Sequence, residues 1–254
     1  MFAPSPAAPS RASRSGRPRR PRRWREGESS VVGWDVGLLG LAVCLLGVGV
    51  IGAHVVELTL PSEAAGLAAQ LLVWLCFALP VVVALRRSRP RGLLRLRAID
   101  LAYGVVFGVL LRAAQGVVSG LGGTPAPWPS TFSTGGGLPA SFSARAIAGV
   151  VVSPVLEEAF FRGVVLVCAF VAIRRVAGAV AAGIAAVALS TVLFVVAHIF
   201  VGDPDAVDLA ILALLGVVAG AFVVGTGRLW PAVWVHLVFN ATGFAMIAVG
   251  TLLA

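Results

Sequence analysis

Seven long apolar stretches, separated by short polar segments, constrain the fold of this chain more than any other feature. A helix that crosses a bilayer needs about 20 residues. Stretches near that length cover residues 34–56, 64–85, 98–120, 145–173, 176–201, 209–226 and 230–253. Because backbone polar groups in lipid must be satisfied within the structure, these segments are expected to be helices. We predict an all-α, polytopic transmembrane helical bundle with about seven spans, within a range of six to eight.

The overall composition supports a membrane location. Hydrophobic residues make up 59% of the chain and charged residues 12%, whereas soluble domains carry about 25% charged residues. The net charge of +9 arises largely from eight arginines between Arg11 and Arg25. This basic run directly precedes the first apolar stretch and lacks interleaved aromatic residues beyond Trp24. We therefore expect it to contact anionic lipid, with no nucleic-acid partner.

Composition divides the chain into four regions. Residues 1–30 are rich in Pro, Ser, Ala and Arg and are predicted to form a disordered cytoplasmic arm. Residues 31–120 are predicted to form an N-terminal membrane region of three helices. A Gly/Pro-rich loop follows at 121–143, and residues 144–254 are predicted to form the catalytic membrane helical bundle.

The charged residues of the loops predict the orientation in the membrane. Arginines follow the second, fourth and sixth stretches, whereas acidic residues follow the first and fifth. Cytoplasmic loops carry an excess of Lys and Arg. We therefore expect the N-terminus and residues 86–97 to be cytoplasmic and the 121–143 loop to lie outside.

Ionisable residues inside membrane spans are rare and often functional, and here they concentrate in the last four stretches. Glu157, Glu158 and Arg162 lie in the fourth stretch. Helical spacing puts Glu158 and Arg162 on one face and Glu157 on a neighbouring face. The Glu158–Arg162 pair could be a purely structural tie between helices. A second carboxylate without a partner is suited to taking a proton from water, and nearby Pro154 predicts a local bend.

Two further pairs of polar or aromatic residues occur at a spacing of four. Phe194 and His198 lie in the fifth stretch, and His236 and Asn240 in the seventh. Each pair shares a helix face. A single membrane histidine is more often a hydrogen-bonded helix contact than a ligand, but two histidines, one asparagine and two glutamates in one small bundle indicate a shared polar site.

These motifs resemble the CAAX prenyl endopeptidase and bacteriocin-processing family of intramembrane proteases, also called the abortive-infection family. The family pattern is EExxxR, then FxxxH, then HxxxN or HxxxB. Its members here would be Glu157, Glu158 and Arg162, then Phe194 and His198, then His236 and Asn240. The resemblance covers residues 145–245 and includes the Phe161-Arg162-Gly163 sequence after the glutamates.

The resemblance implies an intramembrane endopeptidase in a bacterial plasma membrane that hydrolyses a peptide or membrane-protein substrate. In its glutamate-based form, Glu157 and His198 activate water, His236 and Asn240 hold the oxyanion, and Glu158 and Arg162 support the site. In a metal-based form, Glu157, His198 and His236 bind a divalent metal such as zinc. The residues leave open whether the cofactor is none or a metal.

Two alternatives from other classes remain. A non-catalytic membrane immunity or scaffold protein would use the polar cluster for packing, and a small proton-coupled transporter would use it as a proton relay.

The depths of the motifs in the membrane conflict with a simple arrangement of straight spans. Glu157 lies about 27 Å along its helix from the arginines at 174 and 175, whereas His236 lies only about 12 Å from Arg228. Either helices tilt and slide, or residues 203–228 do not cross fully.

Overall fold

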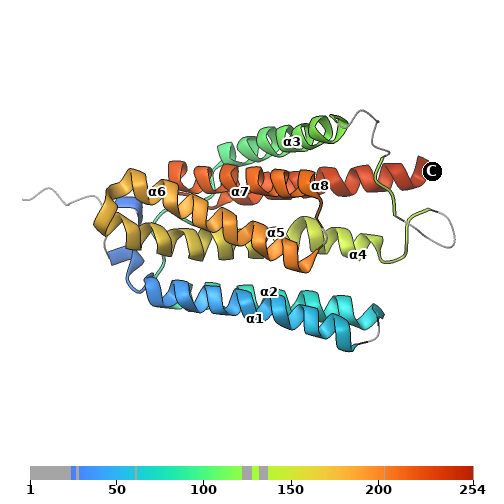
Figure 1. The fold of residues 1–254 in the computed structure, drawn as a ribbon. Coiled ribbons are helices and arrows are strands. Elements are labelled where there is room, and N and C mark those ends of the chain that lie inside the picture. Colours follow the sequence, from blue (N-terminus) through green and yellow to red (C-terminus); the bar gives the residue numbers. More distant parts are fainter. Residues whose placement is uncertain are drawn as a thin grey trace, which may run out of the picture.

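The computed structural model describes residues 24–26, 29–60, 62–121, 128–131, 137–202 and 204–253. Every regular element in this part of the chain is helical, and Figure 1 shows the long helices lying side by side. The elements are η1 Trp24–Glu26, η2 Ser29–Val31, α1 Val36–Thr59, α2 Ser62–Arg87, α3 Ala98–Gly120, α4 Phe142–Ile147, η3 Ala148–Val152, α5 Ser153–Glu157, η4 Glu158–Val165, α6 Leu166–Val201, α7 Ala206–Thr226 and α8 Trp230–Leu253.

Six of the described helical segments are long and apolar enough to cross a membrane. The fourth, Phe142–Val201, contains 60 residues and turns back on itself at Gly178, where φ is 78°. Glycine tolerates this left-handed conformation without steric cost. The prediction of an all-α membrane bundle with about seven spans is confirmed, because the two arms of this hairpin cross separately (Figure 1).

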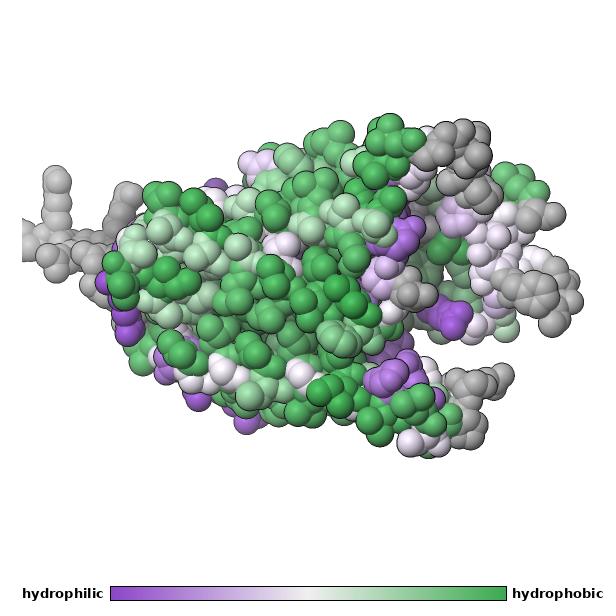
Figure 2. All heavy atoms as spheres, viewed as in Figure 1, coloured by the Kyte–Doolittle hydropathy of each residue, from purple (hydrophilic) through white to green (hydrophobic). Residues whose placement is uncertain are grey.

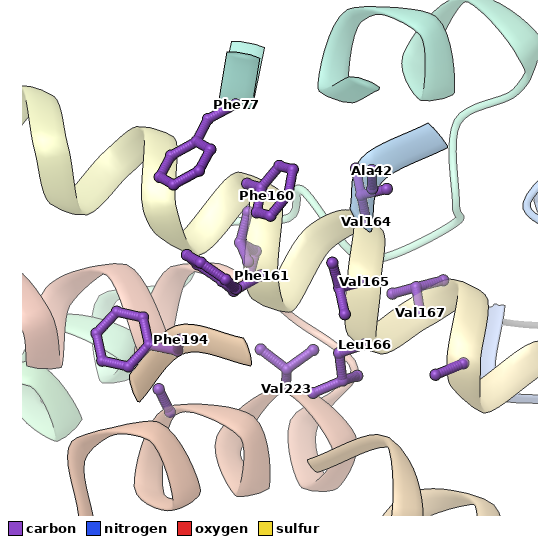
Figure 3. Close-up of a cluster of buried hydrophobic side chains, with 14 of the residues drawn as sticks. Ala42, Phe77, Phe160, Phe161, Val164, Val165, Leu166, Val167, Phe194 and Val223 are labelled. Atoms are coloured by element: carbon purple, nitrogen blue, oxygen red, sulfur yellow. The ribbon is translucent and has the colours of Figure 1, made fainter. Parts of the chain in front are cut away.

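Contacts between the two arms hold the hairpin together well away from its turn. The Phe161 and Phe194 ring centroids lie 5.3 Å apart, and the Ser190 hydroxyl donates to the Phe161 carbonyl at 2.9 Å. Phe77 of α2 stacks on Phe160 at 4.5 Å, and Figure 3 shows the four phenylalanines meeting in the buried core. Such aromatic contacts add about 0.5–1.5 kcal/mol each beyond the burial of their area.

Close packing joins α3 to α8. A Cβ atom at Gly104 would lie 2.3 Å from Trp234 Cβ, and one at Gly108 would lie 2.7 Å from Val238 Cβ. These contacts allow the two backbones to approach closely, as small residues four apart do in membrane helices. The segment of α8 between Trp234 and Val238 carries His236, so this packing positions a predicted site residue.

The surface has an apolar belt along the helices, while hydrophilic residues gather near the two ends (Figure 2). We call one end the arginine end, which carries Arg89, Arg91, Arg174, Arg175 and Arg228. At this end Leu229 N–H donates to the Leu93 carbonyl at 2.8 Å. The opposite end carries the α1–α2 turn, the α6–α7 turn and the end of α8 (Figure 1).

The end of the predicted disordered arm includes residues that are ordered against the bundle. Trp24 is fully buried, and its Nε1 donates to the Gly227 carbonyl at 2.9 Å. Arg25 Nη1 donates to the Val224 and Gly225 carbonyls at 2.8 and 2.7 Å. These bonds satisfy the last carbonyls of α7, which have no partner within the helix. The prediction of disorder for residues 1–23, 27 and 28 lies outside the described residues, as do residues 122–127 and 132–136 of the predicted 121–143 loop.

The conflict in motif depth is resolved because the helices do not all end at the same depth. Glu158 lies about 24 Å along the helix from Arg174, and His236 about 12 Å from Arg228. His236 nevertheless contacts Glu158 directly. By the helical rise, the tip of the Gly178 hairpin projects about 12 Å beyond the α7–α8 turn. Figure 1 shows this turn recessed relative to the hairpin tip, and Trp24 donates to the Gly227 carbonyl there. Helix α7 spans 21 residues, enough to cross.

Candidate active site

The glutamates lie where the fourth helical segment departs from regular α-helical geometry. Helix η3 is a π-helix, and Ser153 N–H donates to the Ala148 carbonyl five residues back. In this register the donor to the Gly149 carbonyl would be residue 154, which is a proline without an N–H. Asn240 Nδ2 donates to that carbonyl at 2.8 Å instead. The second π-helix, η4, begins at Glu158, and π-helical turns often occur at functional sites.

Glu158 joins two helices through a buried ionic network. Its Oε1 accepts from Arg162 Nη1 at 2.9 Å and lies 3.0 Å from His236 Nδ1. The Glu158 and Arg162 side chains are fully buried, and His236 is 3% exposed. A buried charge without a partner is costly, so each member of this network depends on the others. Glu158 and Arg162 thus form the predicted pair, and His236 is a third member that helical spacing could not reveal.

Glu157 faces both histidines without bonding to either. Its Oε2 lies 3.9 Å from His198 Nε2 and 3.9 Å from His236 Nε2. This oxygen is buried and has no hydrogen-bond partner among the residues described. A separation of 3.9 Å is too long for a direct hydrogen bond. Each Glu157–histidine pair is spaced so that one small polar group between them could contact both atoms.

Hydrogen bonds on the far side of each ring define the histidine tautomers. His198 Nδ1 lies 2.8 Å from the Phe194 carbonyl, which can only accept, so Nδ1 carries a hydrogen. His236 Nδ1 donates in the same way to the Glu158 carboxylate. In a neutral ring the lone pair is then on Nε2, the atom that faces Glu157. Both histidines are oriented by a fixed partner.

Phe194 gives the aromatic residue of the second motif a physical role. Its ring lies 4.3 Å from the Arg162 guanidinium carbon, 4.4 Å from the His198 ring centroid and 5.8 Å from that of His236. Arg162 Nε and Nη2 are buried without hydrogen-bond partners in the described part of the chain. The face of an aromatic ring attracts such a cation. Phe194 therefore stabilises Arg162 and packs against both histidines.

Asn240 lies apart from the glutamate–histidine cluster. It is on α8, one turn beyond His236, but its amide donates to Gly149. It lines a cavity of about 770 Å³ together with Gly149 and Ser153. His198 lines a neighbouring cavity of about 470 Å³ and is 32% exposed on its side chain, compared with 14% for Glu157. The structure thus brings five of the six predicted residues together and places the sixth beside them.

Arg112 and Gln115 of α3 line both cavities and were missed from the sequence. Arg112 Nη2 donates to the Phe239 carbonyl at 2.7 Å, and its guanidinium lies 4.0 Å from the Phe239 ring centroid. Gln115 Nε2 donates to Asp208 at 3.0 Å. Attention to the last four stretches, where the ionisable residues concentrate, therefore left out Arg112 of the third stretch. An arginine well inside the 98–120 span was the signal that should have identified α3 as part of the site.

The donor set can be compared with the requirements of a metal. Glu157 Oε2 and the two Nε2 atoms are suitable ligands, and the histidine tautomers match those of metal-binding imidazoles. However, the described residues contain no group of three or more His, Cys, Asp or Glu side chains that could hold a metal ion as arranged. Ligands of tetrahedral zinc at about 2.0–2.1 Å lie closer together than 3.9 Å. These side chains do not form a preassembled metal site.

An all-helical bundle with an apolar belt and a buried glutamate–histidine cluster defines an integral membrane protein with a polar site inside the membrane region. Residues 139–242 match the family model described as type II CAAX prenyl endopeptidase Rce1-like. The matched segment contains all three motifs, and the match supports the resemblance of this part of the chain to CAAX-type membrane proteases. No curated protein and no solved structure matches the chain.

Proposed function

We propose that this protein is an intramembrane endopeptidase that hydrolyses peptide bonds with a water activated by Glu157. The observation that carries the proposal is the buried, unpartnered Oε2 of Glu157, which faces two oriented imidazoles at 3.9 Å. A water about 2.8 Å from both Glu157 Oε2 and His198 Nε2 would donate one hydrogen to each. The match of residues 139–242 to a family model of CAAX prenyl endopeptidases supports a peptide or membrane-protein substrate.

In this mechanism the water oxygen attacks the carbonyl carbon of the scissile peptide bond, and its proton passes to Glu157. The carbonyl oxygen becomes an oxyanion. The oxyanion then re-forms the C=O bond as the C–N bond breaks, the proton moves from Glu157 to the leaving nitrogen, and the products are a carboxylic acid and an amine. General-base assistance of this kind contributes about 10²- to 10⁴-fold to the rate.

His236 is proposed to stabilise the oxyanion. A second proton on Nε2 of His236, in addition to the one on Nδ1, would make both ring nitrogens donors. His236 would then donate through Nδ1 to Glu158, at 3.0 Å, and through Nε2 to the oxyanion. Asn240 would supply a second donor when its amide exchanges the Gly149 carbonyl for the substrate oxygen.

The first prediction concerns metal. We expect purified protein to cleave a prenylated CAAX peptide after treatment with a strong chelator, and to contain zinc well below one atom per chain. The physical reason is that Glu157 and the histidines suffice as proton acceptors and donors. The measurements are metal content and cleavage rate before and after chelation. Stoichiometric zinc, with activity lost on chelation and regained on zinc addition, would instead make Glu157, His198 and His236 metal ligands.

The second prediction concerns orientation. We propose that the arginine end faces the cytoplasm, because arginines concentrate in its loops. Arg89 and Ser141 are exposed near opposite ends. In a cysteine-free background, Arg89→Cys should resist a membrane-impermeant thiol reagent applied to intact cells, whereas Ser141→Cys should react. Both should react after permeabilisation. The reverse pattern in intact cells would invert the proposed topology.

A further inference from the structure

A separate cavity of about 690 Å³ lies at the arginine end, between the start of α1 and the tip of the Gly178 hairpin. Its apolar wall includes Trp24, Trp34 and Phe170, all nearly or fully buried. Arg174 and Arg175 also line it. The cavity shares no lining residue with the two cavities beside the active site. We call it the hairpin pocket.

The positive charge of the hairpin pocket is not balanced within the described structure. Arg174 and Arg175 form no hydrogen bond or ion pair with any residue the structure describes. The single acidic residue in the wall is Asp35. Its carboxylate already accepts from Leu38 N–H at 2.9 Å as the α1 cap and lies 3.7 Å from Arg87. Two guanidinium groups are therefore available to an anion.

The surroundings of the pocket are those of a membrane interface. Val176 and Val180, next to the arginines at the hairpin tip, are 91% and 79% exposed. Tryptophans such as Trp24 and Trp34 concentrate at the boundary between lipid and water. Arginine binds phosphate oxygens with paired hydrogen bonds. A ligand of the pocket thus needs an anionic phosphate group and apolar parts that continue along an exposed apolar surface.

We propose that the hairpin pocket binds an anionic phospholipid. Arg174 and Arg175 hold the phosphate of the headgroup, and the glycerol region packs against Trp24, Trp34 and Phe170. A volume of about 690 Å³ accommodates a headgroup but not whole acyl chains, which extend over Val176 and Val180. This site is distinct from the arginine-rich arm before Trp24, whose attraction to anionic lipid requires no pocket.

A lipid bound in the pocket is expected to stabilise the folded protein, including the α7–α8 turn outside the pocket. Trp24 contributes to the pocket wall and also donates to the Gly227 carbonyl at the α7–α8 turn. Its ring lies 5.3 Å from that of Phe170, edge to face. A ligand that binds only the folded state raises its stability in proportion to the logarithm of ligand concentration over Kd.

The experiment measures the melting temperature of the full chain in neutral detergent with added phosphatidylglycerol, phosphatidylcholine or inorganic phosphate. We expect phosphatidylglycerol to raise the melting temperature of the wild type by about 3 to 5 °C, and the other two to have little effect. The double variant Arg174→Gln, Arg175→Gln should lose this response. The variant Arg174→Lys, Arg175→Lys, which keeps the charge, should retain part of it.

The matched control is Arg86→Gln, Arg89→Gln, which removes two exposed charges from the same end but outside the pocket. It should respond to phosphatidylglycerol like the wild type. An equal loss of response in this control would assign the effect to general charge and overturn the proposal. Equal stabilisation by phosphatidylcholine or by inorganic phosphate would also overturn it. Because the readout is stability, the result is independent of whether the protein is a protease.

Discussion

Glu158→Gln is expected to reduce the stability of the protein by about 3–5 kcal/mol, the usual cost of removing one member of a buried ion pair. Arg162 would keep its positive charge with no exposed surface and no carboxylate within bonding distance. His236 would lose the carboxylate that fixes its Nδ1–H. Activity should therefore fall together with stability, as measured by thermal unfolding in detergent and by cleavage of a prenylated CAAX peptide.

A double-mutant cycle distinguishes the lost pair from a general packing defect. The variant Glu158→Gln, Arg162→Gln removes both charges, so its destabilisation should be smaller than the sum of the two single effects. Glu57→Gln is a matched control, because Glu57 is an exposed carboxylate on α1. Simple additivity in the cycle, or a Glu158→Gln protein as stable as Glu57→Gln, would contradict a buried ionic network around Glu158.

The transmembrane fold could be predicted because the bilayer imposes a length on each apolar segment. The turn at Gly178 falls just inside the predicted span 176–201, three residues after the arginines at 174 and 175 that marked a loop. The Glu158–Arg162 pair could also be predicted, since residues four apart share a face. These features depend on local sequence and on a single physical constraint.

The remaining features of the site depend on contacts between helices that a sequence pattern does not specify. His236 bonds to Glu158 only because the α7–α8 turn is recessed relative to the hairpin tip. Asn240 donates to the Gly149 carbonyl because, in the π-helical register, the backbone donor would be Pro154, which has no N–H. Trp24 was predicted to lie in a disordered arm because the surrounding sequence is rich in Pro and Arg. Composition does not reveal that this one tryptophan bonds to the Gly227 carbonyl.

Glu157→Gln should lose activity without the loss of stability that is expected for Glu158→Gln. Glu157 has no salt bridge to a permanently charged residue, and its Oε2 has no hydrogen-bond partner in the described structure. Gln keeps the shape of the side chain but cannot accept a proton. We expect a loss of about 10² to 10⁴ in cleavage rate with little change in the melting temperature. The two adjacent glutamates would thus be separated into one that supports the fold and one that reacts.

The single-turnover cleavage rate of chelator-treated Glu157→Gln tests most directly whether Glu157 activates water. The comparison is with wild type and Glu57→Gln at saturating enzyme, with substrate binding and thermal stability measured on the same preparations. We predict that Glu157→Gln binds the peptide and melts like the wild type but cleaves at least about 10²-fold more slowly. Cleavage by Glu157→Gln at the wild-type rate would contradict the proposed mechanism.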